Sequence, residues 1–218
     1  MKIISYSLWG NDPKYVTGAI KNIELAKLYF PDWRVRLYLS RNTKFDYTSD
    51  NLDIVYRTEK SSQDGCFWRF EACDSDDIVI IRDLDDRLSE RHKHVVDEWL
   101  KSDLDIHIIK DHPNHTFPIM AGLWGVRNGI LSGISKSIDV WENKSYYTTD
   151  QSFLHLFVFN SLWDKSLIHD PFHKTTGREK DITHKRINYE FLGDSFDEND
   201  NRREDYWTPI KQYEENKN

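Results

Sequence analysis

The order of apolar and polar side chains near the start of the chain predicts a strand followed by a helix. Residues 2–8 are mostly apolar and predict the strand. Asp12 is suited to cap a helix that begins at Pro13, because aspartate accepts hydrogen bonds from free helical N–H groups and proline tolerates the first position. One apolar face then recurs with a helical period as far as Tyr29.

The next segments predict further strands of a parallel sheet. Alternation over residues 35–39 predicts a second strand, and residues 54–56 predict a weaker third. Two strands joined by one helix indicate a right-handed βαβ unit, in which the strands are parallel. A short aromatic helix is expected over residues 64–72. The β-branched residues 78–81 then predict a strand buried on both faces, as in the interior of a parallel sheet.

The second half of the chain continues the alternation of helices and strands. The predicted elements are a helix over 90–100 capped by Ser89, strands over 105–109 and 119–126, helices over 130–141 and 149–159, a strand over 167–169 and a possible edge strand over 189–192. Glycines within the strand over 119–126 indicate that something packs close to its backbone. We therefore expect one α/β domain over residues 1–195, with a mostly parallel central sheet flanked by helices. Residues 196–218 are expected to form a polar, acidic C-terminal tail, loosely wrapped or disordered.

Composition and charge exclude several classes of protein. Aromatic residues make up 14% of the 218 residues, enough for a sizeable core. The net charge is −7 and no basic block interleaves with the aromatics, which argues against nucleic-acid binding. No apolar run approaches the ~20 residues of a transmembrane helix, and the start of the chain does not resemble a signal peptide. Cys66 and Cys73 have neither a zinc-site nor a disulfide-framework spacing, so we expect reduced thiols in a cytoplasmic protein.

A cluster of carboxylates follows the buried strand over 78–81. Asp83, Asp85 and Asp86 lie within four residues, between two arginines. Like charges this close repel one another and are costly near a core. A bound cation would neutralise them, and ligands of open α/β sheets bind at the carboxyl ends of the strands. An acidic turn in solvent, capped by its own arginines, is the alternative interpretation.

An aliphatic strand that ends in Asp83-Leu84-Asp85, with further segments in a fixed order, resembles the nucleotide-sugar glycosyltransferases of the GT-A fold. These segments are residues 6–12, 67–70, 82–87, 110–113, 122–125, 150–151 and 169–170. The set is similar to small glycosyltransferase domains of large DNA viruses, such as the chlorovirus capsid-glycan rhamnosyltransferase domain, and of bacterial polysaccharide clusters. The resemblance covers residues 1 to about 195. It implies a single Rossmann-like GT-A domain.

The resemblance also implies a metal-dependent reaction. A hexosyl or deoxyhexosyl group would move from a nucleoside diphosphate sugar, with a UDP-sugar expected, to a glycan or another hydroxyl acceptor. Asp83 would lie near the ribose and the metal, Asp85 would bind Mn²⁺ or Mg²⁺ directly, and His169 would complete the metal shell. His173 and His184 are alternatives for that ligand. Oxygen ligands and a phosphate partner suit these ions better than zinc.

Donor binding is assigned on the same basis. Tyr6, Ser7 and Trp9, at the carboxyl end of the first strand, would hold the uracil and ribose. Arg69 and Arg87 would bind the diphosphate, because a guanidinium forks onto phosphate oxygens. Ion pairs with the neighbouring aspartates are the alternative for both arginines.

Asp150 and Gln151, which begin the helix over 149–159, are the first candidates for catalysis. Asp150 either caps the helix or faces the reacting sugar, where a carboxylate acts as a base on the acceptor or at the anomeric centre. Asp111 and His112 are alternatives for this role. The residues alone do not distinguish a base from a nucleophile.

Other functions fit the same residues less well. A metal-dependent phosphatase or nucleotidyltransferase, acting on a nucleotide or sugar phosphate, suits the acidic strand end nearly as well, because phosphoryl chemistry also uses clustered aspartates. A glycoside hydrolase needs two carboxylates ~5–10 Å apart across a sugar, which adjacent aspartates do not suit. A lectin-like module would explain the aromatics but not the acidic cluster. Tight binding of UDP in the presence of Mn²⁺ would distinguish a glycosyltransferase from a phosphatase.

Overall fold

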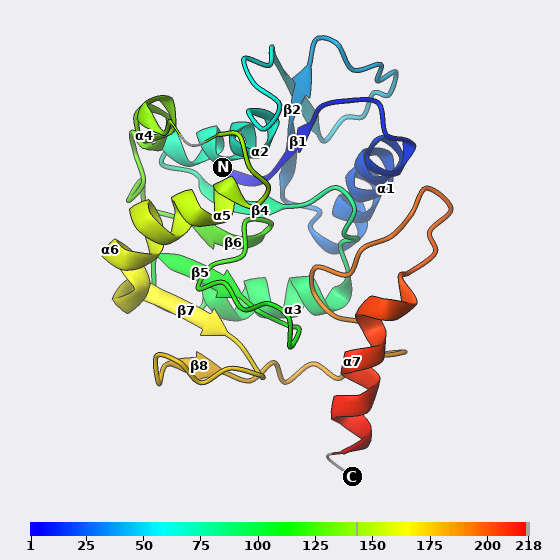
Figure 1. The fold of residues 1–218 in the computed structure, drawn as a ribbon, viewed down its shortest axis with the longest axis vertical. Helices are drawn as coiled ribbons and strands as arrows, with labels where there is room; N and C mark the ends of the chain where they lie inside the picture. The colour runs from blue at the N-terminus through cyan, green and yellow to red at the C-terminus, as the bar shows by residue number, and fades with distance from the viewer. Residues whose placement is uncertain (143, 217–218) are drawn as a thin grey trace.

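The computed structural model describes residues 1–142 and 144–216, and in these residues one sheet has eight strands in the order β3-β2-β1-β4-β6-β5-β7-β8 (Figure 1). The strands are β1 (Lys2–Leu8), β2 (Arg34–Ser40), β3 (Leu52–Arg57), β4 (Ile78–Arg82), β5 (Ile106–Ile109), β6 (Leu123–Val126), β7 (Ser166–His169) and β8 (Glu179–Lys180). β6 runs antiparallel to β4 and β5, and the other neighbours are parallel. The predicted α/β class with a mostly parallel sheet is confirmed.

Helices cover both faces of the sheet. They are α1 (Pro13–Tyr29), α2 (Gly65–Trp68), η1 (Arg69–Asp74), α3 (Glu90–Leu100), α4 (Ile134–Val140), α5 (Thr149–Leu154), η2 (His155–Phe159), α6 (Asn160–Leu162), η3 (Trp163–Lys165) and α7 (Glu204–Glu215), where η1 and η3 are 3₁₀-helices and η2 is a π-helical turn. α1 and α3 pack on one face, and α2, η1, α4 and α5 pack on the other.

β4 is buried on both faces, as its run of β-branched residues predicts. Val79 and Ile81 point to the face covered by α2, α4 and α5, and Ile80 points to the face covered by α1 and α3. All three side chains are fully buried. Each contributes about 1.5–3 kcal/mol of hydrophobic stabilisation. The acidic cluster therefore follows a strand that is packed on both faces of the sheet.

α1 begins where the sequence predicts. The carboxylate of Asp12 accepts a hydrogen bond from the backbone N of Lys14 at 2.9 Å, and Pro13 is the first helical residue. α3 likewise begins after Ser89, whose side chain accepts from the backbone N of His92. These two caps fix the helices that cover one face of the sheet.

α1 packs unusually close to the loop that follows β4. A Cβ atom on Gly18 would lie 1.9 Å from the carbonyl oxygen of Leu84, so no other residue fits without a shift. Asn22 donates to the carbonyls of Leu84 and Asp86 at 3.3 and 2.8 Å and accepts from the N–H of Leu88 at 2.9 Å. The loop that carries the acidic cluster is therefore held by the backbone and side chains of α1.

The predicted edge strand over 189–192 is wrong. Asn188 and Tyr189 have left-handed backbones, with φ of 52° and 58°, which a strand does not accommodate. The edge beside β7 is taken by β8, at Glu179–Lys180. The predicted helix over 130–141 begins only at Ile134, after a left-handed glycine, and the one over 149–159 continues from α5 into a π-helical turn.

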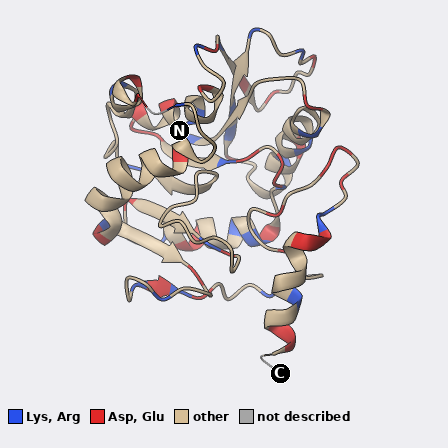
Figure 2. Cartoon of the chain, in the orientation of Figure 1, with Lys and Arg blue, Asp and Glu red and all other residues tan. Residues whose placement is uncertain are grey.

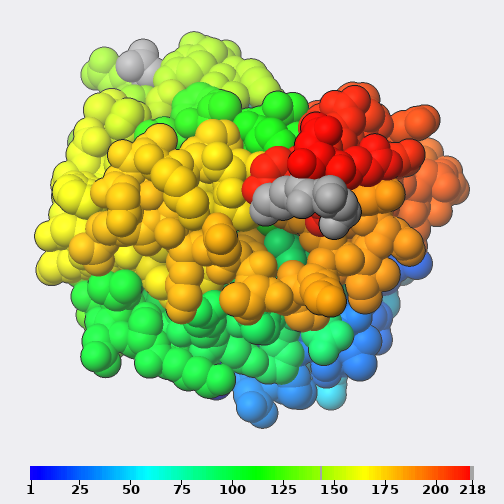
Figure 3. Space-filling model, turned by 90° about the horizontal axis from the view of Figure 1, so that it is seen from below, coloured from blue at the N-terminus to red at the C-terminus, as the bar shows by residue number. Residues whose placement is uncertain are grey.

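The residues after 195, expected as a loose polar tail, contain the helix α7. Figure 3 shows α7 (red) lying against the preceding segment (orange). Ile210 is fully buried, and the carbonyl of Tyr206 bonds to the imidazole of His112 at 2.7 Å. α7 has a single fully buried apolar side chain and an internal proline, Pro209, so its sequence gives only a weak helical pattern.

Lys and Arg are interspersed with Asp and Glu along the described chain (Figure 2). Among residues 1–142 and 144–216, no helix has both the length and the apolar character needed to cross a membrane. Cys66 and Cys73 are free thiols.

Gly18→Ala is expected to destabilise the protein by roughly 1–3 kcal/mol, because the new methyl group meets a backbone oxygen that cannot rotate aside. The figure of roughly 1–3 kcal/mol is the net change in the free energy of unfolding, after the gain of about 1 kcal/mol from alanine's better helix propensity. Urea unfolding measures the difference. Leu28→Ala on the same helix, where the side chain is 67% exposed, should stay within about 0.5 kcal/mol of the wild type. Equal stability of the two variants would show that α1 is free to move off the loop.

Candidate active site

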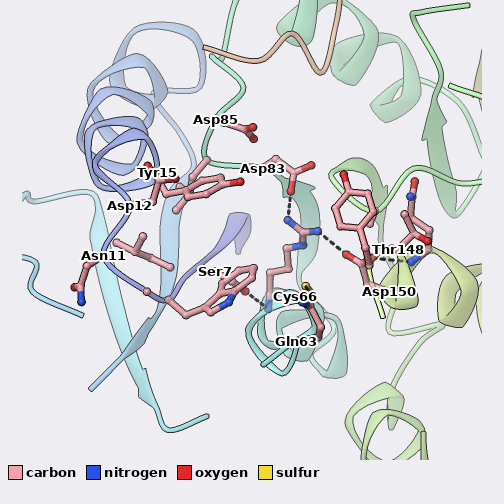
Figure 4. A pocket seen from close by; sticks show the side chains of 18 residues that line it. Ser7, Asn11, Asp12, Tyr15, Gln63, Cys66, Asp83, Asp85, Thr148 and Asp150 are labelled. Carbon is pink, nitrogen blue, oxygen red and sulfur yellow. Dashed lines mark hydrogen bonds and ion pairs between the residues drawn. The ribbon is translucent and has the colours of Figure 1, made fainter. Parts of the chain in front are cut away.

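A cavity of about 410 Å³ lies at the carboxyl ends of β1 and β4 (Figure 4). Its lining comes from residues 7–12 with Tyr15, from the region of α2 and Arg69, from residues 83–85 after β4, from Ala121, and from residues 147, 148, 150 and 151 around the start of α5. Parallel pairing of β1 with β4 brings the first and third of these together. The volume is in the range of small-molecule sites, and its position is where open α/β sheets bind ligands.

Alternation along β1 determines which of its side chains reach this cavity. The hydroxyl of Ser5 donates to the carbonyl of Arg69 at 2.7 Å, and the hydroxyl of Ser7 accepts from the N–H of Arg69 at 2.9 Å. Ser7 and Trp9 line the cavity. Two serines on one face of β1 thus fix the backbone of Arg69 at the cavity floor.

The guanidinium of Arg69 joins two acidic residues from distant parts of the chain. It bonds to the carboxylate of Asp83, and its Nη2 lies 3.1 Å from Oδ2 of Asp150 (Figure 4). Only 6% of the Arg69 side chain is exposed. Burial alone would lower the pKa of Arg69, but the charges of Asp83 and Asp150 raise it. The cation is therefore permanent, and it is shared between the two carboxylates.

Asp83 packs against Gly122, the residue before β6, so closely that a larger residue fits only if the carboxylate moves. A Cβ atom on Gly122 would lie 1.9 Å from Oδ2 of Asp83, which explains the glycine that the sequence places there. Desolvation and the carboxylates of Asp85 and Asp150 raise the pKa of Asp83, while Arg69 opposes the rise. A bound cation would favour the ionised form.

Asp85 is held by two residues that the sequence did not single out. Its Oδ2 lies 3.1 Å from Nζ of Lys14 and accepts from the hydroxyl of Ser195 at 2.9 Å. Its carbonyl accepts from the N–H of Phe196 at 2.8 Å. A first-turn residue of α1 and the segment after β8 therefore meet at this carboxylate. Both contacts are long-range, so no local sequence signal reports them.

Asp150 lies in the first turn of α5 with its carboxylate toward the cavity. Its Oδ1 accepts from the N–H of Gln151 at 2.9 Å, and its Oδ2 faces Arg69. Thr148 occupies the N-cap position with φ of 69° and makes no side-chain cap bond. Among the described residues, Oε1 of Gln151 is buried without a hydrogen-bond partner. This oxygen is an acceptor left for a ligand.

Aromatic and neutral side chains form the wall nearest β1. The ring of Trp9 packs on Gly65, where a Cβ atom would lie 2.1 Å from it, and meets Trp68 edge to face at 6.5 Å. Trp68 and Trp124 are buried, so neither offers a free stacking face. Burial raises the pKa of the Cys66 thiol to about 12, which leaves it protonated and a poor nucleophile.

The structure does not bring Tyr6 or Arg87 to the cavity. Tyr6 points to the opposite face of β1 from Ser7 and is fully buried on the α1 side, where burial raises the pKa of its phenol. Arg87 turns away toward the C-terminal segment, with Nη1 3.0 Å from the carbonyl of Leu84 and Nε 3.1 Å from Asp200. Their proposed contacts with the uridine and the diphosphate have no support in this geometry.

His169 also lies outside the cavity lining. It is fully buried at the end of β7, with Nδ1 2.9 Å from His107 and Nε2 3.0 Å from Glu98. Burial lowers the pKa of His169. The alternative His173 bonds to Asp170 and to a backbone carbonyl. Neither these two histidines nor His184 line the cavity, so the third metal ligand expected from the sequence is not found there.

Asp111 occupies a structural position at the end of β5. It is fully buried, and its carboxylate accepts from Arg91 at 2.7 and 2.8 Å, from Arg186 at 3.0 Å, and from the N–H of Leu192 at 3.0 Å. Burial disfavours its charge, but the two arginines hold the pKa of Asp111 below its usual value. Asp111 therefore fixes the C-terminal segment instead of lining the cavity.

Asp83 and Asp85 suit a divalent cation that arrives with its own ligands. Among residues 1–142 and 144–216, no three His, Cys, Asp or Glu side chains are grouped so as to hold a metal by themselves. Mg²⁺ and similar ions are commonly bound by one or two carboxylates together with substrate phosphates and waters. Two carboxylates facing a cavity of this size fit that arrangement.

The eight-stranded, mostly parallel sheet with helices on both faces is consistent with the GT-A fold that the resemblance implies. The chain is similar to the crystal structure of a glycosyltransferase involved in the glycosylation of the major capsid of PBCV-1, with a TM-score of 0.51 and 16% identity over 78% of this chain and 81% of that one. The galactosyltransferase LgtC, in complex with donor and acceptor sugar analogues, matches with a TM-score of 0.47 and 12% identity over 78% and 73% of the chains. No protein-family description and no curated protein sequence matches the chain. The first likeness confirms the predicted fold.

Gly122→Ala is expected to disturb the site and leave the fold intact. The added methyl group meets the end of a side chain, so Asp83 can swing away, and the loss of its contact with Arg69 should cost about 1–3 kcal/mol of stability. Displacing the carboxylate should weaken Mn²⁺-dependent UDP binding by about tenfold or more, measured by calorimetry. In an Asp83→Ala background the same change should have no further effect. Undiminished UDP affinity in Gly122→Ala would separate Asp83 from ligand binding.

Proposed function

We propose that this protein is a metal-dependent glycosyltransferase that moves a hexosyl or deoxyhexosyl group from a UDP-sugar to a hydroxyl of a glycan. The observation that carries the proposal is the convergence of Asp83, Asp85 and Asp150 with Arg69 on one cavity at the ends of β1 and β4. The fold shared with a capsid glycosyltransferase supports the same class of reaction. The cytoplasmic location expected from the sequence remains a prediction.

The donor nucleotide is assigned to the wall formed by the end of β1 and the start of α1. Ser7 and Trp9 line this wall together with Asn11 and Tyr15, which Figure 4 shows on the same side of the cavity. An aromatic ring offers the base a stacking surface, and the amide and hydroxyl groups offer polar contacts to the ribose. A wall of this kind favours a nucleotide-bearing substrate over a simple phosphate ester.

Asp83 and Asp85 are assigned to the diphosphate end of the donor. A divalent cation, Mn²⁺ or Mg²⁺, supplies Lewis-acid stabilisation of the leaving diphosphate when bound. Arg69 holds Asp83 in place and is committed to two carboxylates. We therefore assign Arg69 to positioning these acidic groups, with any phosphate contact secondary to that role.

Asp150 and Gln151 are assigned to the reacting end of the sugar. Asp150 shares Arg69 with Asp83 and faces the cavity, where a carboxylate can accept the proton of an acceptor hydroxyl or face positive charge at the anomeric carbon. The unpartnered Oε1 of Gln151 is suited to accept a hydrogen bond from a sugar hydroxyl. Asp150 lies across the cavity from Asn11 and Tyr15 (Figure 4), which supports this division of roles.

Asp85→Asn is expected to abolish metal-dependent nucleotide binding, because the amide keeps the shape of the side chain but loses its charge. The affinity for UDP in Mn²⁺ should fall to the value measured in EDTA. Calorimetric titration provides the measurement, and Asp97→Asn on α3, a half-exposed member of an ion pair, serves as the matched control. Equal UDP affinity of Asp85→Asn and the wild type, with and without EDTA, would refute the metal assignment.

The same titrations distinguish the alternative chemistry. A metal-dependent phosphatase or nucleotidyltransferase would show clustered aspartates as well. A phosphatase would also bind a sugar phosphate with Mn²⁺ as tightly as UDP, because its phosphoryl site does not need the uracil, whereas a nucleotidyltransferase would release pyrophosphate from UTP and a sugar phosphate. A clear preference for UDP, without pyrophosphate release from UTP, supports sugar transfer.

Asp150→Asn is expected to lower the rate of sugar transfer by about 10²–10⁴-fold while UDP binding survives, because the amide cannot take a proton or carry charge. Rates are measured by UDP release with saturating donor. Asp164→Asn, in the turn before β7, is the control for a change of one charge. A variant that transfers sugar within a few-fold of the wild type would remove Asp150 from the chemistry and leave it as a partner of Arg69.

A further inference from the structure

Lys14 occupies a position that helix formation does not explain. It lies in the first turn of α1, where the positive end of the helix dipole disfavours a cation. The cap from Asp12 fixes its backbone N, and its ammonium extends to Oδ2 of Asp85 at 3.1 Å. The carboxylate at the end of β4 therefore accounts for the placement of this ammonium group.

The contact between Lys14 and Asp85 is more than a loose surface pair. The two side chains are 27% and 22% exposed, and the hydroxyl of Ser195 donates to the same carboxylate oxygen at 2.9 Å. An ion pair in open solvent contributes little to stability, and partial burial strengthens the attraction between the two charges. The ammonium thus occupies one side of the carboxylate to which the proposed function assigns the metal.

Two cations offset the acidic groups that converge on the cavity. Arg69 pairs with Asp83 and Asp150, and Lys14 pairs with Asp85. A divalent cation that arrives alone would have to displace the ammonium of Lys14 from Asp85. It would then lie beside that ammonium, and the repulsion between the two positive charges would weaken its binding. A cation arriving with a diphosphate brings phosphate oxygens, to which a displaced ammonium can turn.

We propose that Lys14 is a positioning residue that holds Asp85 in the ligand-free protein and moves to the diphosphate when metal and nucleotide bind together. The inference rests on the proposed function and adds to it that metal binding depends on the nucleotide. A lysine suits this role because its ammonium is a point charge on a flexible stem and can move between two anions. The metal and the nucleotide then bind as one unit, each strengthening the other by the same factor.

The test compares Lys14→Met with the wild type in two binding measurements. Mn²⁺ alone is titrated by the loss of its free electron paramagnetic resonance signal, and UDP is titrated by calorimetry at saturating Mn²⁺. Lys14→Met should bind Mn²⁺ alone about tenfold more tightly, because no ammonium competes for Asp85. It should bind UDP about tenfold more weakly, because a charge-assisted phosphate contact is lost.

Matched variants separate charge from other effects. Lys27→Met removes a charge from the same helix at a residue paired with Glu24 and Asp50, and it should change neither affinity. Lys14→Arg keeps the charge and should bind Mn²⁺ alone as the wild type does. Ser195→Ala removes only a neutral donor and should tighten Mn²⁺ binding less than Lys14→Met.

The two arms also separate this inference from the proposed function. An unchanged affinity of Lys14→Met for Mn²⁺ alone would overturn the role of Lys14, whatever the nucleotide does. Undiminished UDP binding in Lys14→Met would overturn the transfer of the ammonium to the diphosphate. Absence of Mn²⁺-dependent UDP binding in the wild type would instead refute the proposed function, and the Mn²⁺ titration would still decide whether Lys14 competes for Asp85.

Discussion

The buried guanidinium of Arg69 is the interaction on which the site depends. It lies between the end of β4 and the start of α5 and pairs with Asp83 and Asp150. Removing one partner of a buried ion pair typically costs about 3–5 kcal/mol, because an uncompensated charge is left behind. Acidic residues from distant parts of the chain can face one cavity because a single cation lies between them. The serines of β1 contribute by fixing the backbone of that arginine.

Features that rest on neighbouring residues were predictable from the sequence. The cap at Asp12, the start of α1 and the doubly buried strand β4 follow from local side-chain chemistry and periodicity. So does the placement of Asp83 and Asp85 at a cavity, because strand ends in an α/β sheet are where ligands bind. The antiparallel direction of β6 was not predictable, since an apolar run carries no information about strand direction.

Features that rest on distant contacts were not predictable. Tyr6 and Ser7 are adjacent and both can contact a nucleotide, but alternation sends them to opposite faces of β1, and only the packing of α2 decides which face meets the cavity. Lys14 and Ser195 meet at Asp85 although they are far from it in sequence. His169 stands where the resemblance implies a metal ligand, but its side chain bonds to a second histidine and a glutamate inside the protein.

Asp85 and Asp111 show why the environment of a carboxylate, and not its motif, decides its role. Both follow buried strands, and the resemblance assigned a function to each. Asp111 is fully buried between two guanidinium groups that fork onto both of its oxygens, so it fixes the chain and has no free face for a ligand. Asp85 is partly exposed at a cavity, and its charged partner is a lysine whose flexible stem allows the ammonium to leave. A carboxylate can serve a reaction when its native partners are replaceable, and on this criterion Asp85 qualifies and Asp111 does not.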